Sequence, residues 1–204
     1  MDFNVWMNAL TKPAETFAAQ KGKGGISEGA VNFAIAFAVS ALISAIVAFL
    51  MPTPTVAIEG YDFAVPKPGP ESIIINPIMG AIVGVILMFI AVGILYVMAM
   101  ILGGKGGFGA QYYLTSIYYA PIAIITAILG VVPVVGGILG LLLGLYSLYL
   151  LTIMLKTLHE FSILMAVLTW LIPGVVLFLV VFVLLAAIFG PYLALLGGGM
   201  KLPV

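Results

Sequence analysis

Residues 163–190 read ILMAVLTWLIPGVVLFLVVFVLLAAIFG, and this stretch contains no charged side chain. A helix needs roughly 20 apolar residues to cross about 30 Å of hydrocarbon, so the stretch is long enough to span a membrane. Four further apolar stretches are also long enough: residues 31–51, 77–102, 112–132 and 136–158, of which only the last contains a charged side chain, Lys156. Their apolar residues run on without alternation, which is typical of helices rather than of a transmembrane β-barrel. The sequence therefore predicts an all-α bundle of five transmembrane helices.

The composition of the whole chain excludes several classes of protein. Of its 204 residues, 64% are hydrophobic and 7% are charged, and the mean hydropathy is +1.33. A soluble domain carries about 25% charged residues, so a soluble enzyme and a disordered tail are both excluded. The seven basic residues are all lysines and are balanced by seven acidic residues, which leaves no basic patch for nucleic acid. The expected environment is the lipid bilayer.

The lysines predict which way the spans run. Alternate connections fall on opposite sides of the membrane, with five lysines on one side and two on the other: Lys12, Lys21, Lys23, Lys105 and Lys156, against Lys67 and Lys201. Because lysine-rich loops stay in the cytoplasm, we expect a cytoplasmic N-terminus and an outside C-terminus in the cell membrane. The expected divisions are a cytoplasmic segment (1–29), a five-span domain (30–192) and a short external tail (193–204).

Two segments outside the spans each allow two interpretations. In the first twenty residues, apolar side chains recur at near-helical spacing, and Pro13 should begin a second short helix. This segment either lies flat in the membrane interface or packs as a cytoplasmic cap under the bundle. The proline-rich loop 52–76 is expected to be extended and stiff. It either folds back over the bundle or binds a partner, for example through Tyr61 and Phe63.

The third and fourth spans are expected to form a tight helical hairpin, since only Pro133 and Gly136-Gly137 separate them. One long broken helix is the alternative.

Small residues predict where the helices touch, because spans in lipid associate through close packing. The first span carries a seam of alanines and the fourth a stripe of glycines: Ala34, Ala38, Ala41, Ala45 and Ala48, then Gly136, Gly140 and Gly144. Gly80 and Gly84 form a weaker version in the second span. We expect close backbone approach along the glycine stripe. These seams serve either packing within one chain or a dimer face.

Polar residues inside the spans gather in the third and fourth. Tyrosines and hydroxyls crowd both: Tyr112, Tyr113, Thr115, Ser116, Tyr118 and Tyr119, then Tyr146, Ser147, Tyr149 and Thr152. They would form hydrogen bonds between helices. The alternative is a polar pathway for a solute.

A small charged cluster ends the fourth span. Lys156 and Glu160 are four residues apart, so they are expected to pair on one helix face, beside His159. His159 is either a structural histidine at the interface or a pH-sensitive or partner-binding residue. One histidine and no cysteine cannot form a common zinc site, and no paired carboxylates lie within a span. The expectation is no catalytic residues, no metal and no cofactor, and therefore no enzyme.

Three motifs give the chain a family resemblance. The first is Leu10-Thr11-Lys12-Pro13 with Phe17. The second is Phe108 with Tyr112-Tyr113 and Tyr118-Tyr119-Ala120-Pro121. The third is Tyr146-Ser147-Leu148-Tyr149-Leu150, leading to Leu158-His159-Glu160-Phe161-Ser162 and Ala166. In their order these motifs resemble the Yip family of multi-span membrane proteins, in its prokaryotic branch, over residues 10–173.

The resemblance implies a non-enzymatic membrane scaffold with five spans. It also singles out family-motif residues as candidates for partner binding: Pro13, Phe17, Tyr118, Tyr119, Pro121, Lys156, His159 and Glu160. Eukaryotic members bind prenylated Rab-type GTPases and one another. This chain lacks their Asp-Leu-Tyr-Gly-Pro motif and their long N-terminal domain, so GTPase binding is in doubt and is not carried over.

The leading hypothesis is a scaffold that binds other membrane proteins or itself, or that organises the membrane. The alternative is a small-solute or ion transporter or channel that uses the tyrosine-lined third and fourth spans. A sealed core would favour the scaffold, and a polar-lined cavity would favour transport.

Overall fold

The computed structural model describes residues 2–51, 55–58, 61–64 and 68–198. Its elements follow one another as α1 (Phe3–Thr11), α2 (Pro13–Gln20), α3 (Ile26–Leu50), β1 (Thr55–Ile58), β2 (Tyr61–Ala64), α4 (Ser72–Ile101), α5 (Phe108–Leu129), α6 (Pro133–His159) and α7 (Ile163–Gly198). Five of these helices, α3 to α7, are long and apolar enough to cross a membrane. The predicted all-α, five-span fold is confirmed, and the chain is a multi-pass membrane protein.

The spanning helices α3 to α6 begin a few residues before the predicted apolar stretches, whereas α7 begins at the predicted residue, Ile163. Polar residues such as Ser27 and Glu28 form the first turn of α3, where Glu28 accepts a hydrogen bond from the Gly25 amide at 2.9 Å and caps the helix. Pro77 was predicted to open the second span, but it lies inside α4. Hydropathy locates the hydrocarbon-crossing part of a helix, whereas caps decide where the helix starts.

The third and fourth spans are separate helices joined by residues 130–132, and Pro133 is the first residue of α6. A side chain on Gly136 would lie 2.0 Å from the Leu129 carbonyl oxygen, so this tight turn requires glycine there. In the loop after α3, β1 and β2 pair as a short antiparallel hairpin, with Thr55 opposite Ala64. This pairing was not predicted, because the loop was expected to be only extended. The predicted partner role of Tyr61 and Phe63 stays a prediction.

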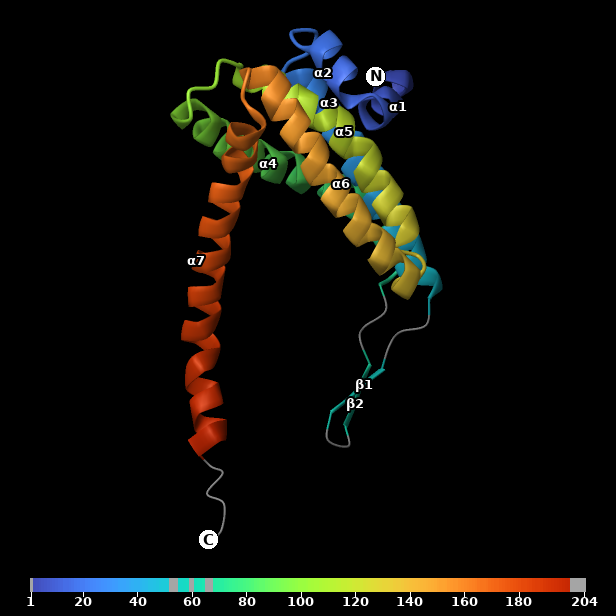
Figure 1. Ribbon diagram of the computed structural model, residues 1–204. Coiled ribbons are helices and arrows are strands. Elements are labelled where there is room, and N and C mark those ends of the chain that lie inside the picture. The colour runs from blue at the N-terminus through green and yellow to red at the C-terminus, as the bar shows by residue number, and fades with distance from the viewer. Residues whose placement is uncertain (1, 52–54, 59–60, 65–67, 199–204) are drawn as a thin grey trace.

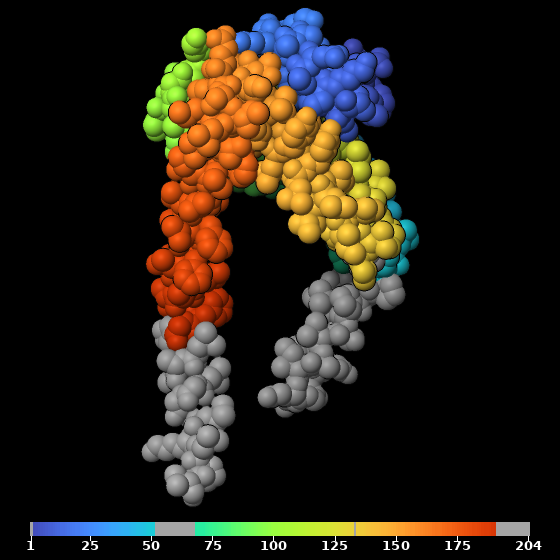
Figure 2. Space-filling view, viewed as in Figure 1, coloured from blue at the N-terminus to red at the C-terminus, as the bar shows by residue number. Residues whose placement is uncertain are grey.

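Helix α5 lies at the centre of the bundle. Half of its spanning segment is buried, and it contacts α1, α3, α4 and α6. By contrast, the most apolar stretch of α7 has no buried residue, although Ala166 and Thr169 near the start of the helix are buried. Figure 1 shows α7 diverging from the other helices, which it meets only near its own N-terminal end. Figure 2 shows a wide opening between α7 and the part of the molecule formed by α5 and α6.

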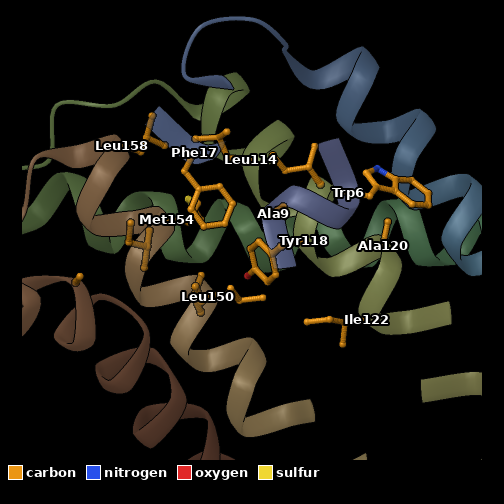
Figure 3. Packing of buried hydrophobic residues seen from close by; sticks show 14 of the residues in the cluster. Trp6, Ala9, Phe17, Leu114, Tyr118, Ala120, Ile122, Leu150, Met154 and Leu158 are labelled. Carbon is orange, nitrogen blue, oxygen red and sulfur yellow. The ribbon is translucent and has the colours of Figure 1, made fainter. Parts of the chain in front are cut away.

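The main core lies where the N-terminal helices meet α5 and α6. Trp6 and Ala9 of α1 and Phe17 of α2 are buried there, beside Tyr118 of α5 and Leu150 of α6 (Figure 3). The N-terminal segment is therefore a cap packed against the bundle. Two other apolar side chains of α1, Phe3 and Met7, are exposed. They give the segment the amphipathic character from which interfacial binding was predicted.

The glycine stripe of α6 is not the close helix contact that was expected. A side chain at Gly140 would meet only Thr126 Cγ2, at 4.0 Å, and one at Gly144 would meet nothing within 4 Å. The close contact lies instead between α3 and α4, where a Cβ on Gly80 would be 3.0 Å from Ala41 Cβ and one on Gly84 would strike the Phe37 ring at 2.3 Å. The stripe of α6 faces a groove, so repeating small residues did not by themselves mark a contact.

The alanine seam of the first span forms the predicted helix contact at one position. Ala41 is the residue of α3 that meets Gly80 of α4, and Ala45 is 2% exposed. Ala34 and Ala38 are partly buried, and Ala48 is exposed. The question of a dimer face is left as a prediction.

Candidate functional site

The N-terminal ends of α3 and α5 and the C-terminal end of α6 meet under the cap, and most of the family-motif residues lie there. Pro13 is the first residue of α2, where its fixed backbone starts a helix. The placement brings Phe17 against α5: its ring lies 6.0 Å from that of Tyr118, edge to face (Figure 3). Residues a hundred positions apart in sequence thus form one packed cluster.

Two further motif residues of α5 lie on different surfaces. The ring of Tyr119 packs near those of Phe33 and Phe37, at 5.9 and 6.1 Å. It also lines the groove that the glycines of α6 face. Pro121 is buried within α5 and cannot donate a backbone hydrogen bond there. These positions are explained by packing among α3, α5 and α6.

His159, the only histidine in the chain, is 1% exposed and has both ring nitrogens engaged. Nδ1 accepts a hydrogen bond from the Gly106 amide at 3.1 Å. Nε2 lies 2.8 Å from Gln111 Oε1. Because Nδ1 must accept, Nε2 carries the proton and donates to the glutamine, so this arrangement holds the neutral ring in one tautomer. His159 thereby ties the end of α6 to the start of α5.

The loop between α4 and α5 is shaped to admit this histidine. A side chain on Gly104 would lie 2.5 Å from His159 Nδ1, and one on Gly106 would lie 2.4 Å from Leu158 Cγ. Gly103 has a φ of 85°, which favours glycine. The Gly103-Gly104-Lys105-Gly106-Gly107 loop therefore closes over the end of α6.

Glu160 pairs with lysines from two other loops and not with Lys156. Its carboxylate lies 3.0 Å from Lys105 Nζ and 3.5 Å from Lys21 Nζ. The expected pair fails because Glu160 is the left-handed C-cap of α6, with a φ of 59°, so its side chain leaves the helix face that carries Lys156. Within the described residues, Lys156 is exposed and forms no ion pair.

The charge of these lysines acts on the Glu160 carboxyl. The hydrogen bond from Lys105, together with the positive charges of Lys105 and Lys21, holds the pKa of Glu160 below its ordinary value. All three side chains are exposed to solvent, so the pairs are screened and weak individually. The cluster joins the α2–α3 linker, the α4–α5 loop and the α6–α7 turn.

The polar groups of the spans form hydrogen bonds between elements. The Tyr112 hydroxyl donates to the Val85 carbonyl of α4 at 3.3 Å, and the Tyr113 hydroxyl donates to Gln20 Oε1 of α2 at 3.1 Å. The Tyr146 hydroxyl donates to the Leu10 carbonyl of α1. Trp170 Nε1 donates to Thr152 Oγ1 at 3.0 Å and holds the start of α7 on α6. These bonds hold the cap and α7 to the bundle.

Sequence reasoning missed Gln111 and the glycine loop. Gln111 is 0% exposed, and its amide nitrogen also donates to the Val92 carbonyl at 3.4 Å. The available signal was that it is the lone carboxamide at the start of an apolar span, where an unpaired amide would be costly. It needed a partner, and the lone histidine was a good candidate.

No group of histidine, cysteine or carboxylate side chains that could hold a metal ion occurs among the described residues. In comparisons with known proteins, a family model described as the Yip1 domain matches residues 7–185, which is most of the chain. No curated protein and no solved structure gives a significant match.

Proposed function

The chain belongs to the Yip1-domain family, and from this premise we propose that it is a non-catalytic scaffold of the cell membrane that binds other membrane proteins through its spans. The observation that carries the proposal is the exposure of α7. Leu177, Phe178 and Phe182 of this helix are 64%, 68% and 60% exposed, and α7 leaves the bundle soon after its first turns. A spanning helix of another protein could pack on it from the side that faces the opening in Figure 2.

The test is photocrosslinking in native membranes. A photoreactive amino acid at Leu177 should capture specific membrane proteins, identified by mass spectrometry after purification. The same amino acid at Leu155, which is 0% exposed in the core of the bundle, is the matched control and should capture none. Capture of lipid alone at Leu177, equal to that of an unrelated single-span helix, would contradict the scaffold.

A second part of the proposal is that the cap surface also contacts partners. Lys156 is exposed and unpaired among the described residues, so neutralising it leaves the packing around His159 in place. Lys156→Gln is expected to leave the protein folded and inserted and to reduce the recovery of co-purifying proteins. If Lys156→Gln and wild type recover the same proteins in the same amounts, this surface takes no part.

The proposed orientation places the cap in the cytoplasm. Lys23→Cys and Gly107→Cys should be shielded from an impermeant thiol reagent in intact cells, while Pro68→Cys should label. A side chain at Gly107 meets nothing within 4 Å, and the chain has no native cysteine, so the variants are clean probes. Labelling at Lys23→Cys with protection at Pro68→Cys would show that the cap lies outside the cell, opposite to the proposed orientation.

One observation favours the second candidate, a small-solute transporter or channel. A groove of about 700 Å³ lies between α3, α5 and α6, and it is lined partly by hydroxyls such as those of Thr126 and Ser147. Towards the cap, Phe17, Tyr118 and Leu150 are packed together in the buried core, which favours the scaffold over a passage there. Reproducible flux in reconstituted vesicles that Ser147→Ala or His159→Gln changes would replace the scaffold by the transporter.

A further inference from the structure

A separate cavity of about 530 Å³ lies at the cap end of the molecule, between α1, the N-terminal turns of α3 and the start of α5. Asp2 and Glu28 are among its lining residues, and both are exposed. Trp6 and Asn32, which are 4% and 5% exposed, also line it, together with Tyr113. Val31 reaches it from the apolar part of α3, so the cavity lies at the level where a membrane surface would meet the bundle.

Two carboxylates give this cavity its charge. Asp2 Oδ1 accepts a hydrogen bond from the Asn4 amide at 2.9 Å. Glu28 Oε2 accepts from the Gly25 amide and the Ser27 hydroxyl, each at 2.9 Å. These bonds fix both side chains in place while leaving further lone pairs for another donor. Among the described residues that line the cavity there is no lysine, so their charge is negative and would repel an anion.

Asn32 supplies an acceptor that the protein itself does not use. The Ser116 hydroxyl donates its single proton to the Tyr113 carbonyl at 2.7 Å, so it can only accept from Asn32. Asn32 Nδ2 is the donor, at 3.0 Å. The amide orientation is therefore fixed, and within the described part of the chain nothing donates to Asn32 Oδ1. Asn32 as a whole is 5% exposed, and its oxygen is not among the fully buried polar atoms, so it stays open to a donor from the cavity that the residue lines.

We propose that this cavity binds a primary ammonium group at the membrane surface. Such a group has three N–H donors and a positive charge, which match the oxygens of Asp2, Glu28 and Asn32. The rings of Trp6 and Tyr113 in the lining add a favourable environment for a cation. A quaternary ammonium offers no N–H to the Asn32 oxygen and fits less well. The inference does not depend on the scaffold function.

The group can come from an ethanolamine lipid headgroup or from a free amine, and one experiment separates the sources. The full chain in detergent is titrated with short-chain phosphatidylethanolamine, its N-methylated forms, short-chain phosphatidylcholine and ethanolamine alone. Binding is followed by tryptophan fluorescence, since Trp6 lines the cavity. We expect affinity to fall at each N-methylation, by at least tenfold from phosphatidylethanolamine to phosphatidylcholine. Tighter binding of phosphatidylethanolamine than of ethanolamine assigns the site to lipid, and equal binding assigns it to the free amine.

Asp2→Asn combined with Glu28→Gln should abolish this preference. Both side chains are exposed, and glutamine keeps an oxygen that can cap α3, so the variant should fold; its melting temperature in phosphatidylcholine verifies that. Glu15→Gln, at an exposed position of α2 outside the cavity, is the matched control and should keep the preference. Equal affinity of the wild type for the ethanolamine and choline lipids overturns the proposal. A preference that survives in the double variant also overturns it.

Discussion

Helices α5 and α7 are both long and apolar enough to cross a membrane, yet one lies at the centre of the bundle and the other stands in the open. The most apolar stretch of α5 has a mean hydropathy of 1.5 and is 50% buried, whereas that of α7 has a mean hydropathy of 3.1 and is 0% buried. Between lipid and protein an apolar side chain gains little from burial. Polar side chains need partners, so the span that carries them is drawn into the protein.

The contacts of each helix agree with this explanation. Gln111, Thr115 and Ser116 of α5 are all buried and hydrogen-bonded. On α7 the hydroxyl of Thr169 and the indole of Trp170 lie in the first turns, which is also where the helix touches α6. Beyond Pro173 the helix has no polar side chain up to Gly190, and this part is the exposed part. Substitutions on both helices and at the contacts around them test this explanation.

The largest effect is expected from truncating a buried ring of α5. Tyr112 is 0% exposed, packs against Phe33 with ring centroids 5.1 Å apart, and fills the space that Gly29 leaves. Tyr112→Ala should lower the free energy of unfolding by about 4 kcal/mol, because it leaves a cavity and removes the hydrogen bond to Val85. Unfolding in mixed micelles with increasing SDS measures it.

The matched change on α7 is Phe178→Ala, at a side chain that is 68% exposed. It should leave the free energy of unfolding unchanged, because lipid or detergent replaces the lost contacts. If Phe178→Ala lowered the free energy of unfolding as much as Tyr112→Ala, α7 would be packed against another part of the protein or a partner. The contrast between a buried α5 and an exposed α7 would then be wrong.

The next effect comes from the histidine that ties α6 to the start of α5. His159→Leu removes the acceptor of the Gly106 amide and the donor to Gln111 in a buried position. Leaving such groups unpaired costs roughly 1–3 kcal/mol each, so we expect a loss of about 3 kcal/mol. Lys156→Gln, one turn earlier and exposed, should cost nothing measurable.

A second substitution at His159 separates the contribution of its hydrogen bonds from that of its shape. His159→Asn keeps a short polar side chain and should restore part of the lost stability if hydrogen bonding is the cause. Equal losses for His159→Leu and His159→Asn would instead assign the role of the ring to its shape alone.

A smaller effect is expected at the contact between α3 and α4. Gly80→Leu should overpack the approach to Ala41 and cost about 2 kcal/mol in the free energy of unfolding. Gly144→Leu is the matched control, since a side chain there meets nothing within 4 Å, and it should be neutral. Thermal unfolding in detergent measures both. If Gly144→Leu lowered the stability and Gly80→Leu did not, the close helix contact would lie along α6, as its glycine pattern predicted.

The sequence predicted the five spans because length and hydropathy are local properties of the chain. It also predicted Pro13 at the start of the second short helix, since proline has a preferred place there. The partners of Glu160 could not be predicted in this way. They come from loops 55 and 139 residues away in sequence (160 − 105 and 160 − 21), and they depend on a left-handed cap at a residue that is not glycine.

The close helix contact predicted from the glycine stripe of α6 was wrong for a related reason. A small residue allows a close approach without requiring one, so its meaning depends on which helix lies opposite. Gly80 faces α3 closely, and Gly140 and Gly144 face a groove. The central position of α5 was more predictable, because the polar residues that draw it inward are visible in the sequence.

The smallest effect is expected at Glu160, which links the turn before α7 to the loop before α5. The pKa of its carboxyl is lowered by Lys105 first and by Lys21 second, so the unfolded state binds a proton more tightly than the folded state. Its contribution to stability is therefore fully present above the ordinary carboxyl value of about 4.3 and is lost as the pH falls through the lower value of the folded state. The melting temperature of the wild type should be slightly above that of Glu160→Gln at pH 7, and the two should coincide at about pH 3.

The control is Glu15→Gln, at an exposed position of α2 that forms no ion pair among the described residues. Its melting temperature should match that of the wild type at both pH values. A gap between wild type and Glu160→Gln that widens as the pH falls would show that the carboxylate is not stabilised by these lysines.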